Sequence, residues 1–111
     1  MNSTAESLDR EALRRYARRV GDRWPLERAH VGGSRVTGAQ DGPAFLVILV
    51  SSGFDGIPWL ERVHQAESLW DGAEMGDRAE VHCYTPVEFE RKLHQLPAVR
   101  EAAERGVKLT A

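Results

Sequence analysis

The sequence predicts helices packed on a small β-sheet, an α+β or α/β arrangement of layers. The first observation is an unbroken apolar run at residues 44–50, rich in β-branched side chains, as expected of a strand buried on both faces. The second is that apolar residues recur with a helical period before and after this run. The third is the segment Thr85-Pro86-Val87-Glu88, in which an N-cap threonine, a proline at the first helical position and a glutamate three residues after the cap indicate a helix start.

A chain of 111 residues has room for one core, so we expect a single domain spanning residues 1–111. The 15 basic and 17 acidic side chains leave a net charge of -2, which favours neither a nucleic acid nor an anionic membrane as partner. Cys83 is the single cysteine and cannot form an internal disulfide. Together with a polar N-terminus and the lack of a long apolar stretch, this predicts a cytoplasmic protein without a membrane helix.

The N-terminal half is expected to contain one helix and two strands. Ser3 and Glu6 have the spacing of a capping box, and the apolar period that follows predicts a helix over residues 5–21. Residues 27–31 alternate polar and apolar side chains, which is typical of a half-buried strand. The run at residues 44–50 is expected to be the central strand of the sheet.

The second half is expected to contain three helices and one strand. Pro58 is placed to open the first helix, whose apolar stripe is formed by Trp59 or Leu60, Val63, Ala66 and Trp70. Residues 71–76 are expected to be a loop. Residues 79–84 read as a strand with Val81 and Cys83 on one face and Glu80, His82 and Tyr84 on the other. Two short helices over residues 86–94 and 97–105 complete the chain.

Gly32, Gly33 and Ser34 follow the first strand, and Arg35 comes next. Because glycine has no side chain, a ligand can approach the backbone here. Exposed N–H groups, the Ser34 hydroxyl and the Arg35 charge can then hold phosphate oxygens. The same backbone freedom serves an ordinary tight turn, which is the more frequent role of such a tripeptide.

The sequence around this tripeptide distinguishes it from an ordinary tight turn. The stretch VGGSRVTGAQDGPAFLVILVSSGF, followed later by AEVHCYTPVEFERK, resembles the minimal nucleotidyltransferases of the DNA polymerase β superfamily, and the resemblance covers about residues 13–109. Gly33-Ser34-Arg35 and Gly38 match that family's Gly-Ser-Arg-x-x-Gly. The resemblance implies the α+β nucleotidyltransferase fold, a small mixed sheet with helices packed on it. It also implies transfer of a nucleotide from a nucleoside triphosphate to an acceptor.

The resemblance further places the metal-binding positions of the family on this sequence. Active members hold two Mg²⁺ ions with an Asp-x-Asp pair on the second strand and a third acid on a neighbouring strand. Here the pair falls on Phe45 and Val47, which cannot bind a metal, and the third acid falls on Glu80. Asp41 and Asp55 lie beyond the two ends of the strand, where they cannot replace the pair. We therefore expect no metal site and no conventional two-metal catalysis. Glu80 is expected to be a vestige of the family's third acid, without a catalytic role.

Phe45, Val47 and Leu49 share one strand face and form an apolar stripe, called here the 45–49 stripe. An apolar stripe is unfavourable in water, so we expect it to be covered by the last two helices of the chain or by another chain. A contact surface would include this stripe or the exposed face of the helix that carries Trp59 and Trp70. The protein is accordingly expected to form a homo-oligomer or to bind a partner.

The other chemically capable side chains have structural interpretations. Cys83 is expected to be a small core residue, since no positive neighbour is evident to lower its pKa. His82 is expected to border solvent, and surface positions are expected for His30, His64 and His94. A solvated helix face, rather than RNA binding, is expected for Arg14, Arg15, Arg18 and Arg19. Core or interface positions, rather than base stacking, are expected for Trp24, Trp59 and Trp70.

Two functions remain open from the sequence. The first is a binding or regulatory module with no turnover, possessing the fold but acting through a partner or as a nucleotide sensor. Minimal nucleotidyltransferases often act as the antitoxin of a small helical HEPN-type protein, which the resemblance makes the first expected partner. The second is an enzyme that transfers a nucleoside monophosphate from a triphosphate to a protein or small molecule through an altered metal site. No cofactor is expected for the first, whereas Mg²⁺ and a nucleoside triphosphate are expected for the second.

Overall fold

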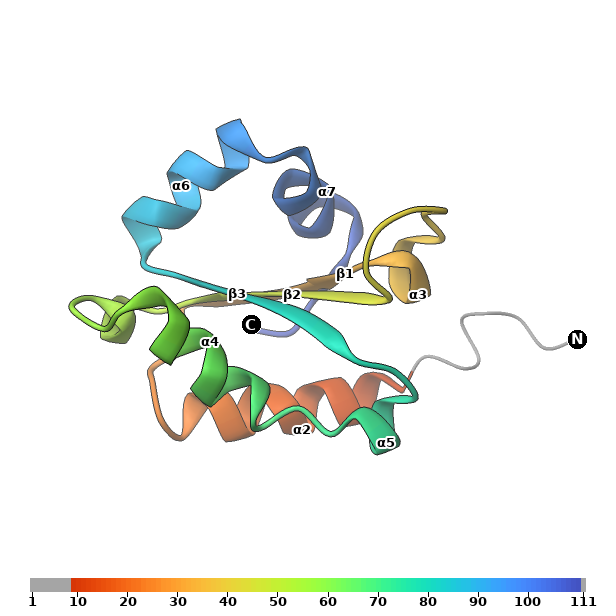
Figure 1. Cartoon of the computed structure of the whole chain (residues 1–111), viewed down its shortest axis with the longest axis horizontal. Helices are drawn as coiled ribbons and strands as arrows, with labels where there is room; N and C mark the ends of the chain where they lie inside the picture. Colours follow the sequence, from red (N-terminus) through yellow and green to blue (C-terminus); the bar gives the residue numbers. More distant parts are fainter. Residues whose placement is uncertain (1–8, 111) are drawn as a thin grey trace, which may run out of the picture.

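A mixed four-stranded sheet lies between two layers of helices (Figure 1). The computed structural model describes residues 9–110. The strands are β1 (Arg28–Gly32), β2 (Phe45–Val50), β3 (Ala79–Tyr84) and β4 (Val107–Lys108), in the order β3-β2-β1-β4. β1 is antiparallel to β2 and β4, whereas β2 and β3 are parallel. The predicted α+β class, the mixed sheet and the central position of β2 are confirmed.

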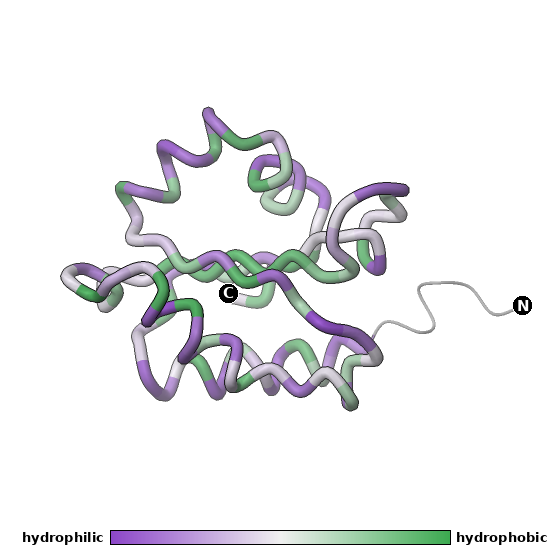
Figure 2. The backbone as a smooth tube through the Cα atoms, viewed as in Figure 1, coloured by the Kyte–Doolittle hydropathy of each residue, from purple (hydrophilic) through white to green (hydrophobic). Residues whose placement is uncertain are grey.

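One face of the sheet is covered by the helices that precede and follow β2 in the chain (Figure 1). These helices are α2 (Arg10–Gly21), α4 (Trp59–Glu67) and the single-turn α5 (Gly72–Met75). Side chains at odd-numbered positions of the three long strands point into this layer and join Leu13, Tyr16 and Val20 of α2 in one buried cluster. Hydrophobic residues follow one another without interruption along β2, whereas hydrophilic and hydrophobic residues alternate along β3 and the helices (Figure 2).

The opposite face is covered by α6 (Pro86–Gln95) and α7 (Pro97–Arg105). Even-numbered strand positions such as Leu46 and Ile48 pack there with Phe89 of α6 and with Val99 and Ala102 of α7. α7 approaches β1 closely, because a Cβ atom at Gly32 would lie 2.8 Å from the Cβ atom of Ala102. Both faces of the central strands are therefore sealed, which explains the unbroken apolar run of β2.

The 45–49 stripe is buried, but by a different layer from the one expected. Phe45 is 2% exposed, and Val47 and Leu49 are fully buried beneath the α2 and α4 layer. The last two helices cover the other face of the sheet. The expectation that this stripe could form a contact surface for another chain is therefore wrong, because the chain covers the stripe itself.

Side-chain caps account for the starts of α2 and α6. The predicted capping box at Thr85 is present, with Thr85 Oγ1 accepting from the Glu88 N–H and Glu88 accepting from the Thr85 N–H. The N-cap of α2 is Asp9, whose carboxylate accepts from the Ala12 N–H at 2.9 Å. The helix expected over residues 5–21 therefore begins only at Arg10, because Asp9 is extended and caps it, and the capping box expected at Ser3 and Glu6 lies outside the described residues.

Short elements that were not predicted are α5, β4 and the single 3-10 turn η1 (Ser52–Phe54). Residues 71–76, expected to be a loop, contain the single turn α5, because the Asp71 carboxylate accepts hydrogen bonds from the N–H groups of Ala73 and Glu74. Beyond α7, the chain returns along β1 as β4. Among the described residues, no helix combines the length and the apolar composition needed to cross a membrane.

His30 was expected at the surface, but it is only 4% exposed. It lies on the even-numbered face of β1, where its ring stacks on Phe89 of α6 with a centroid distance of 5.9 Å and an interplanar angle of 12°. In the part of the chain that the structure describes, neither ring nitrogen has a hydrogen-bond partner. Burial lowers the pKa of His30 below its ordinary value, and the nearby positive charges of Arg28 and Lys108 lower it further.

Replacing His30 with leucine is expected to raise the free energy of unfolding at neutral pH by about 1–2 kcal/mol, because two unpaired buried nitrogens are removed. In the parent chain, the unfolded state takes up a proton on His30 below about pH 6.5, while the folded state resists protonation. The parent should therefore lose stability as the pH falls below about 6.5, and His30→Leu should lose less. Urea unfolding at pH 7.5 and pH 5.5 measures both effects, with His64→Leu at an exposed position as the control. Equal pH sensitivity of His30→Leu and the parent would contradict this expectation.

Candidate functional site

The turn from β1 into the short helix α3 (Ser34–Thr37) holds the residues that sequence analysis assigned to phosphate binding. Gly33 is the N-cap of α3 and has φ +97°, a conformation that favours glycine. A Cβ atom at Gly33 would lie 2.5 Å from the carbonyl oxygen of Ala44. The tripeptide thus forms a strand-to-helix turn, and the glycine is required there by the close approach of the two backbones.

Two backbone N–H groups of this turn, those of Ser34 and Arg35, are already used. The Ser34 N–H donates to the Pro43 carbonyl at 3.0 Å, and the Arg35 N–H donates to the Ala44 carbonyl at 2.9 Å. The expected cradle of exposed N–H groups is therefore absent at Ser34 and Arg35. The Ser34 hydroxyl and the Arg35 guanidinium are the groups of this turn that stay available for an anion.

Arg35 lies against Phe45, the residue at which the family resemblance places the first aspartate of the Asp-x-Asp pair. Its guanidinium carbon is 5.8 Å from the centroid of the Phe45 ring, and the Phe45 ring is 5.2 Å from that of Trp70. Arg35 Nη1 is also 3.9 Å from a carboxylate oxygen of Asp77, in the segment before β3. Arg35 and the Trp70 ring thus flank Phe45, and Val47 lies fully buried in the same layer.

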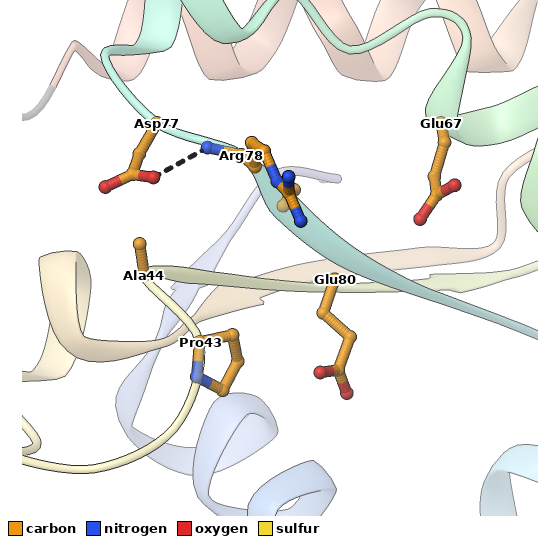
Figure 3. Close-up of a pocket in the computed structure, with 7 residues that line it drawn as sticks. Pro43, Ala44, Glu67, Asp77, Arg78 and Glu80 are labelled. Carbon is orange, nitrogen blue, oxygen red and sulfur yellow. Dashed lines mark hydrogen bonds between the residues drawn. The ribbon is translucent and has the colours of Figure 1, made fainter.

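Glu80 lies on the other face of the sheet. In the parallel pairing of β2 with β3, Glu80 is opposite Leu46, so its side chain shares a face with Leu46 and Ile48. Figure 3 shows Glu80 on the opposite side of β3 from Glu67. The structure therefore does not bring Glu80 together with Phe45 and Val47, the grouping that the family resemblance implied. All six residues of β2 are apolar, so neither face of this strand supplies a carboxylate.

A hollow of about 420 Å³ opens where β2 and β3 begin. Its lining consists of Pro43, Ala44, Glu67, Asp77, Arg78, Ala79 and Glu80 (Figure 3). Three carboxylates against one guanidinium disfavour the phosphates of a nucleotide unless a cation intervenes. Within residues 9–110, no group of three or more His, Cys, Asp or Glu side chains has an arrangement that could hold a metal ion.

A chain of hydrogen bonds joins alternate side chains of β3. His82 Nε2 is 2.8 Å from a carboxylate oxygen of Glu80, and His82 Nδ1 is 2.7 Å from the Tyr84 hydroxyl. Sequence analysis placed these three residues on one face but did not foresee the chain, although their spacing of two residues on a strand is the signal that could have indicated it. Both ring nitrogens of His82 are occupied. Burial, with smaller contributions from Cys83, Glu80 and Glu88, raises the pKa of Tyr84 to about 12, so its hydroxyl stays protonated.

Cys83 is a core residue, as expected. It is fully buried on the odd-numbered face of β3, in the cluster formed with α2 and α4. Burial raises the pKa of its thiol to about 12, although the Arg62 charge opposes the shift. A protonated, inaccessible thiol is not a nucleophile.

The arrangement of the sheet and helices defines this chain as a protein of the nucleotidyltransferase fold. A crystal structure of a candidate nucleotidyltransferase from Sulfolobus solfataricus matches it with a TM-score of 0.62 and 19% sequence identity, over 82% of this chain and 81% of that chain. At this identity, the likeness establishes the fold alone. No protein-family model matches the sequence, and no curated protein matches it either.

Proposed function

We propose that this chain is a nucleotidyltransferase-fold protein that does not transfer nucleotides and acts as a binding or regulatory module. The observation that supports this most strongly is the β2 strand, in which the two positions implied to carry aspartates are Phe45 and Val47, both sealed in the core. A single acid at Glu80, on the other face, cannot hold two Mg²⁺ ions against a triphosphate.

The apolar residues of β2 contribute to stability where active members of the family have charges. Burying a Phe or Val side chain contributes roughly 1.5–3 kcal/mol relative to exposure. The chain thus has a packed core where the family resemblance implies a hydrated metal site. Because apolar side chains fill the position of the metal site, we favour a role in which the protein binds a partner through its surface.

The module is proposed to work in the cytoplasm, as a homo-oligomer or as the antitoxin-like partner of a small helical protein of the HEPN type. The composition supports the compartment, and the family resemblance supports the partner. The contact surface is proposed on the exposed face of α4, since the 45–49 stripe is buried.

Nucleotide binding without turnover is compatible with this role. The Ser34 hydroxyl and the Arg35 guanidinium would contact the phosphates, and Gly32 and Gly33 would shape the turn. Binding would be weak and nearly independent of Mg²⁺, because β2 carries no carboxylate pair to hold the bridging ion.

The absence of nucleotidyl transfer is the test of this proposal. The chain is incubated with labelled ATP, GTP, CTP or UTP and with Mg²⁺ or Mn²⁺, alone and with its partner protein once known. Label incorporated into protein is expected to equal that of a blank without the chain, since two-metal stabilisation of the triphosphate is missing. Incorporation that is lost in Glu80→Ala would contradict the proposal and favour an enzyme with an altered metal site.

A further inference from the structure

The two layers of helices are packed on the sheet to different extents. Among the described residues, seven buried side chains form the cluster beneath α6 and α7, against fifteen in the cluster beneath α2 and α4. The two layers lie on opposite faces of the sheet, and α6 and α7 follow β3 directly in the chain (Figure 1). The α6–α7 layer can therefore open while the other layer stays closed, since local openings start where few apolar contacts are buried.

One side chain anchors α6 to the sheet. Among the described side chains of this helix, Phe89 alone is buried, and Leu93 is only partly buried. The Phe89 ring stacks on the ring of His30, and the Arg28 guanidinium carbon lies 5.3 Å from its centroid. The packing of α6 on β1 thus depends on the contact between Phe89 and His30.

This contact requires a neutral His30. In the described part of the chain, both ring nitrogens of this buried side chain lack a hydrogen-bond partner. A proton would add a charge that has neither an acceptor nor water. The neighbouring charges of Arg28 and Lys108 are also positive, and Ile48, opposite His30 on β2, is apolar. The closed layer therefore disfavours the protonated ring.

The carboxylates of the covering helices do not offset this charge. On α6, Glu88 is bound to Arg62 and to the Thr85 N–H. On α7, Glu101 is paired with Arg105. The other charged or titratable side chains of the two helices are exposed or half-buried, and they are Glu90, Arg91, Lys92, His94, Arg100 and Glu104. The charges that act on His30 are thus the two positive ones.

We propose that protonation of His30 opens the α6–α7 layer locally, at a pH at which the rest of the fold stays native. Opening gives the imidazolium ring access to water and exposes Phe89 together with Leu46 and Ile48 of the sheet. This pH-sensitive opening goes beyond the proposed function and does not depend on whether the chain transfers nucleotides. It also differs from the stability loss described above, which concerns complete unfolding.

The size of the effect follows from the linkage between protonation and opening. In the open layer, His30 has its ordinary pKa of about 6.5, whereas in the closed layer its pKa is lower. The open form therefore takes up a proton below about pH 6.5, and the equilibrium constant for opening should rise up to about tenfold between pH 7.5 and pH 5.5. Glu88 does not interfere, because the pKa of its carboxyl lies below 4.5.

Amide hydrogen exchange of the full chain, measured by NMR at pH 7.5 and pH 5.5, tests this proposal. After correction for the intrinsic pH dependence of exchange, the protection factors of α6 amides should fall about tenfold at the lower pH. They should change little in 1 M urea, because a local opening exposes little surface. Amides of α2 should be better protected at both pH values and should lose protection in urea, since they exchange through complete unfolding.

Two variants identify the titrating group. His30→Leu should reduce the pH effect on α6 to less than about twofold. His94→Gln, which alters an exposed histidine of α6 itself, should retain the tenfold effect. The Hε1 chemical shift of His30 in the parent provides a check without any variant, because it should remain that of a neutral ring at pH 5.5.

Three results would overturn the proposal. Equal protection and equal urea dependence of α6 and α2 would show that His30 acts on complete unfolding alone. A tenfold effect that persists in His30→Leu would assign the pH response to another group. Titration of the His30 ring in the folded chain with a pKa near 6.5 would show that the closed layer accepts the proton.

Discussion

Replacing Arg62 with alanine is expected to lower the free energy of unfolding by about 3 kcal/mol, because a largely buried charged group with several partners is lost. The Arg62 side chain is 8% exposed. Its Nη1 donates to Glu88 at 2.7 Å and to the Cys83 carbonyl at 3.1 Å, and its Nε donates to the Ile57 carbonyl at 2.7 Å. Alanine would remove this donor from the Cys83 and Ile57 carbonyls at the junction of α4, β3 and α6, and would leave Glu88 with its Thr85 hydrogen bond but without its cation. Urea unfolding at neutral pH measures the loss.

A matched control separates burial from charge alone. Arg105 is paired with Glu101 on the surface of α7, and its side chain is 69% exposed. Arg105→Ala should therefore cost less than about 1 kcal/mol. A loss in Arg62→Ala no larger than that in Arg105→Ala would contradict the expectation.

The ion pair between Arg62 and Glu88 also predicts that the stability of the fold depends on pH. Burial raises the pKa of the Glu88 carboxyl, but hydrogen bonds from Arg62 and Thr85 outweigh it and hold the pKa below its ordinary value of 4.5. A carboxylate with a depressed folded-state pKa contributes stability above its unfolded pKa and loses that contribution as the pH falls. The parent should thus lose this contribution below about pH 4.5, and Arg62→Ala should lose less of it.

Replacing Gly33 with alanine is expected to lower the free energy of unfolding by about 2–4 kcal/mol, because strain and a backbone clash act together. Gly33 has φ +97°, and the added Cβ atom would lie 2.5 Å from the Ala44 carbonyl oxygen and 2.8 Å from the Leu46 nitrogen. Those atoms belong to the backbone at the start of β2 and cannot move aside as a flexible side chain can. Thermal and urea unfolding of the variant measure the effect.

Gly38 provides the comparison. It also has a positive φ, +79°, but nothing lies within 4 Å of an added Cβ atom. Gly38→Ala should therefore show the conformational strain alone, about 1 kcal/mol. Equal losses at the two glycines would show that the approach to Ala44 is unimportant. A larger loss at Gly33 would show that the fold itself requires a glycine at this position of the Gly-Ser-Arg-x-x-Gly motif, without any bound phosphate.

Elements specified by local chemistry could be predicted from the sequence. β3 begins and ends where residues 79–84 predicted it, because alternation and the Thr85 cap are local signals. β2 was identified from its apolar run, one residue longer than observed. α5 and β4 were missed because a four-residue helix and a two-residue strand contain too little sequence to show a period.

What the sequence could not supply was the assignment of residues to faces and layers. His30 alternates with apolar neighbours as a surface residue would, but α6 and α7 cover that face of β1 and bury it. Glu80 and Phe45 were grouped by their order in the chain, whereas the register of β2 with β3 separates them onto opposite faces. Strand register and layer order are set by long-range contacts. A shift of one residue in the register of a strand moves each of its side chains to the other face of the sheet.

The position of α4 beside β3 also affects how the sheet can associate with other chains. β3 is an edge strand, and unpaired edges can recruit further strands and seed aggregation. At one end of this edge, Arg62 donates to the Cys83 carbonyl, and at the other, the indole N–H of Trp70 donates to the Asp77 carbonyl at 3.0 Å. These side chains occupy carbonyl groups that an incoming strand would need. These two contacts leave fewer free carbonyl groups at the two ends of the β3 edge for an incoming strand to pair with, and so make strand addition there less favourable.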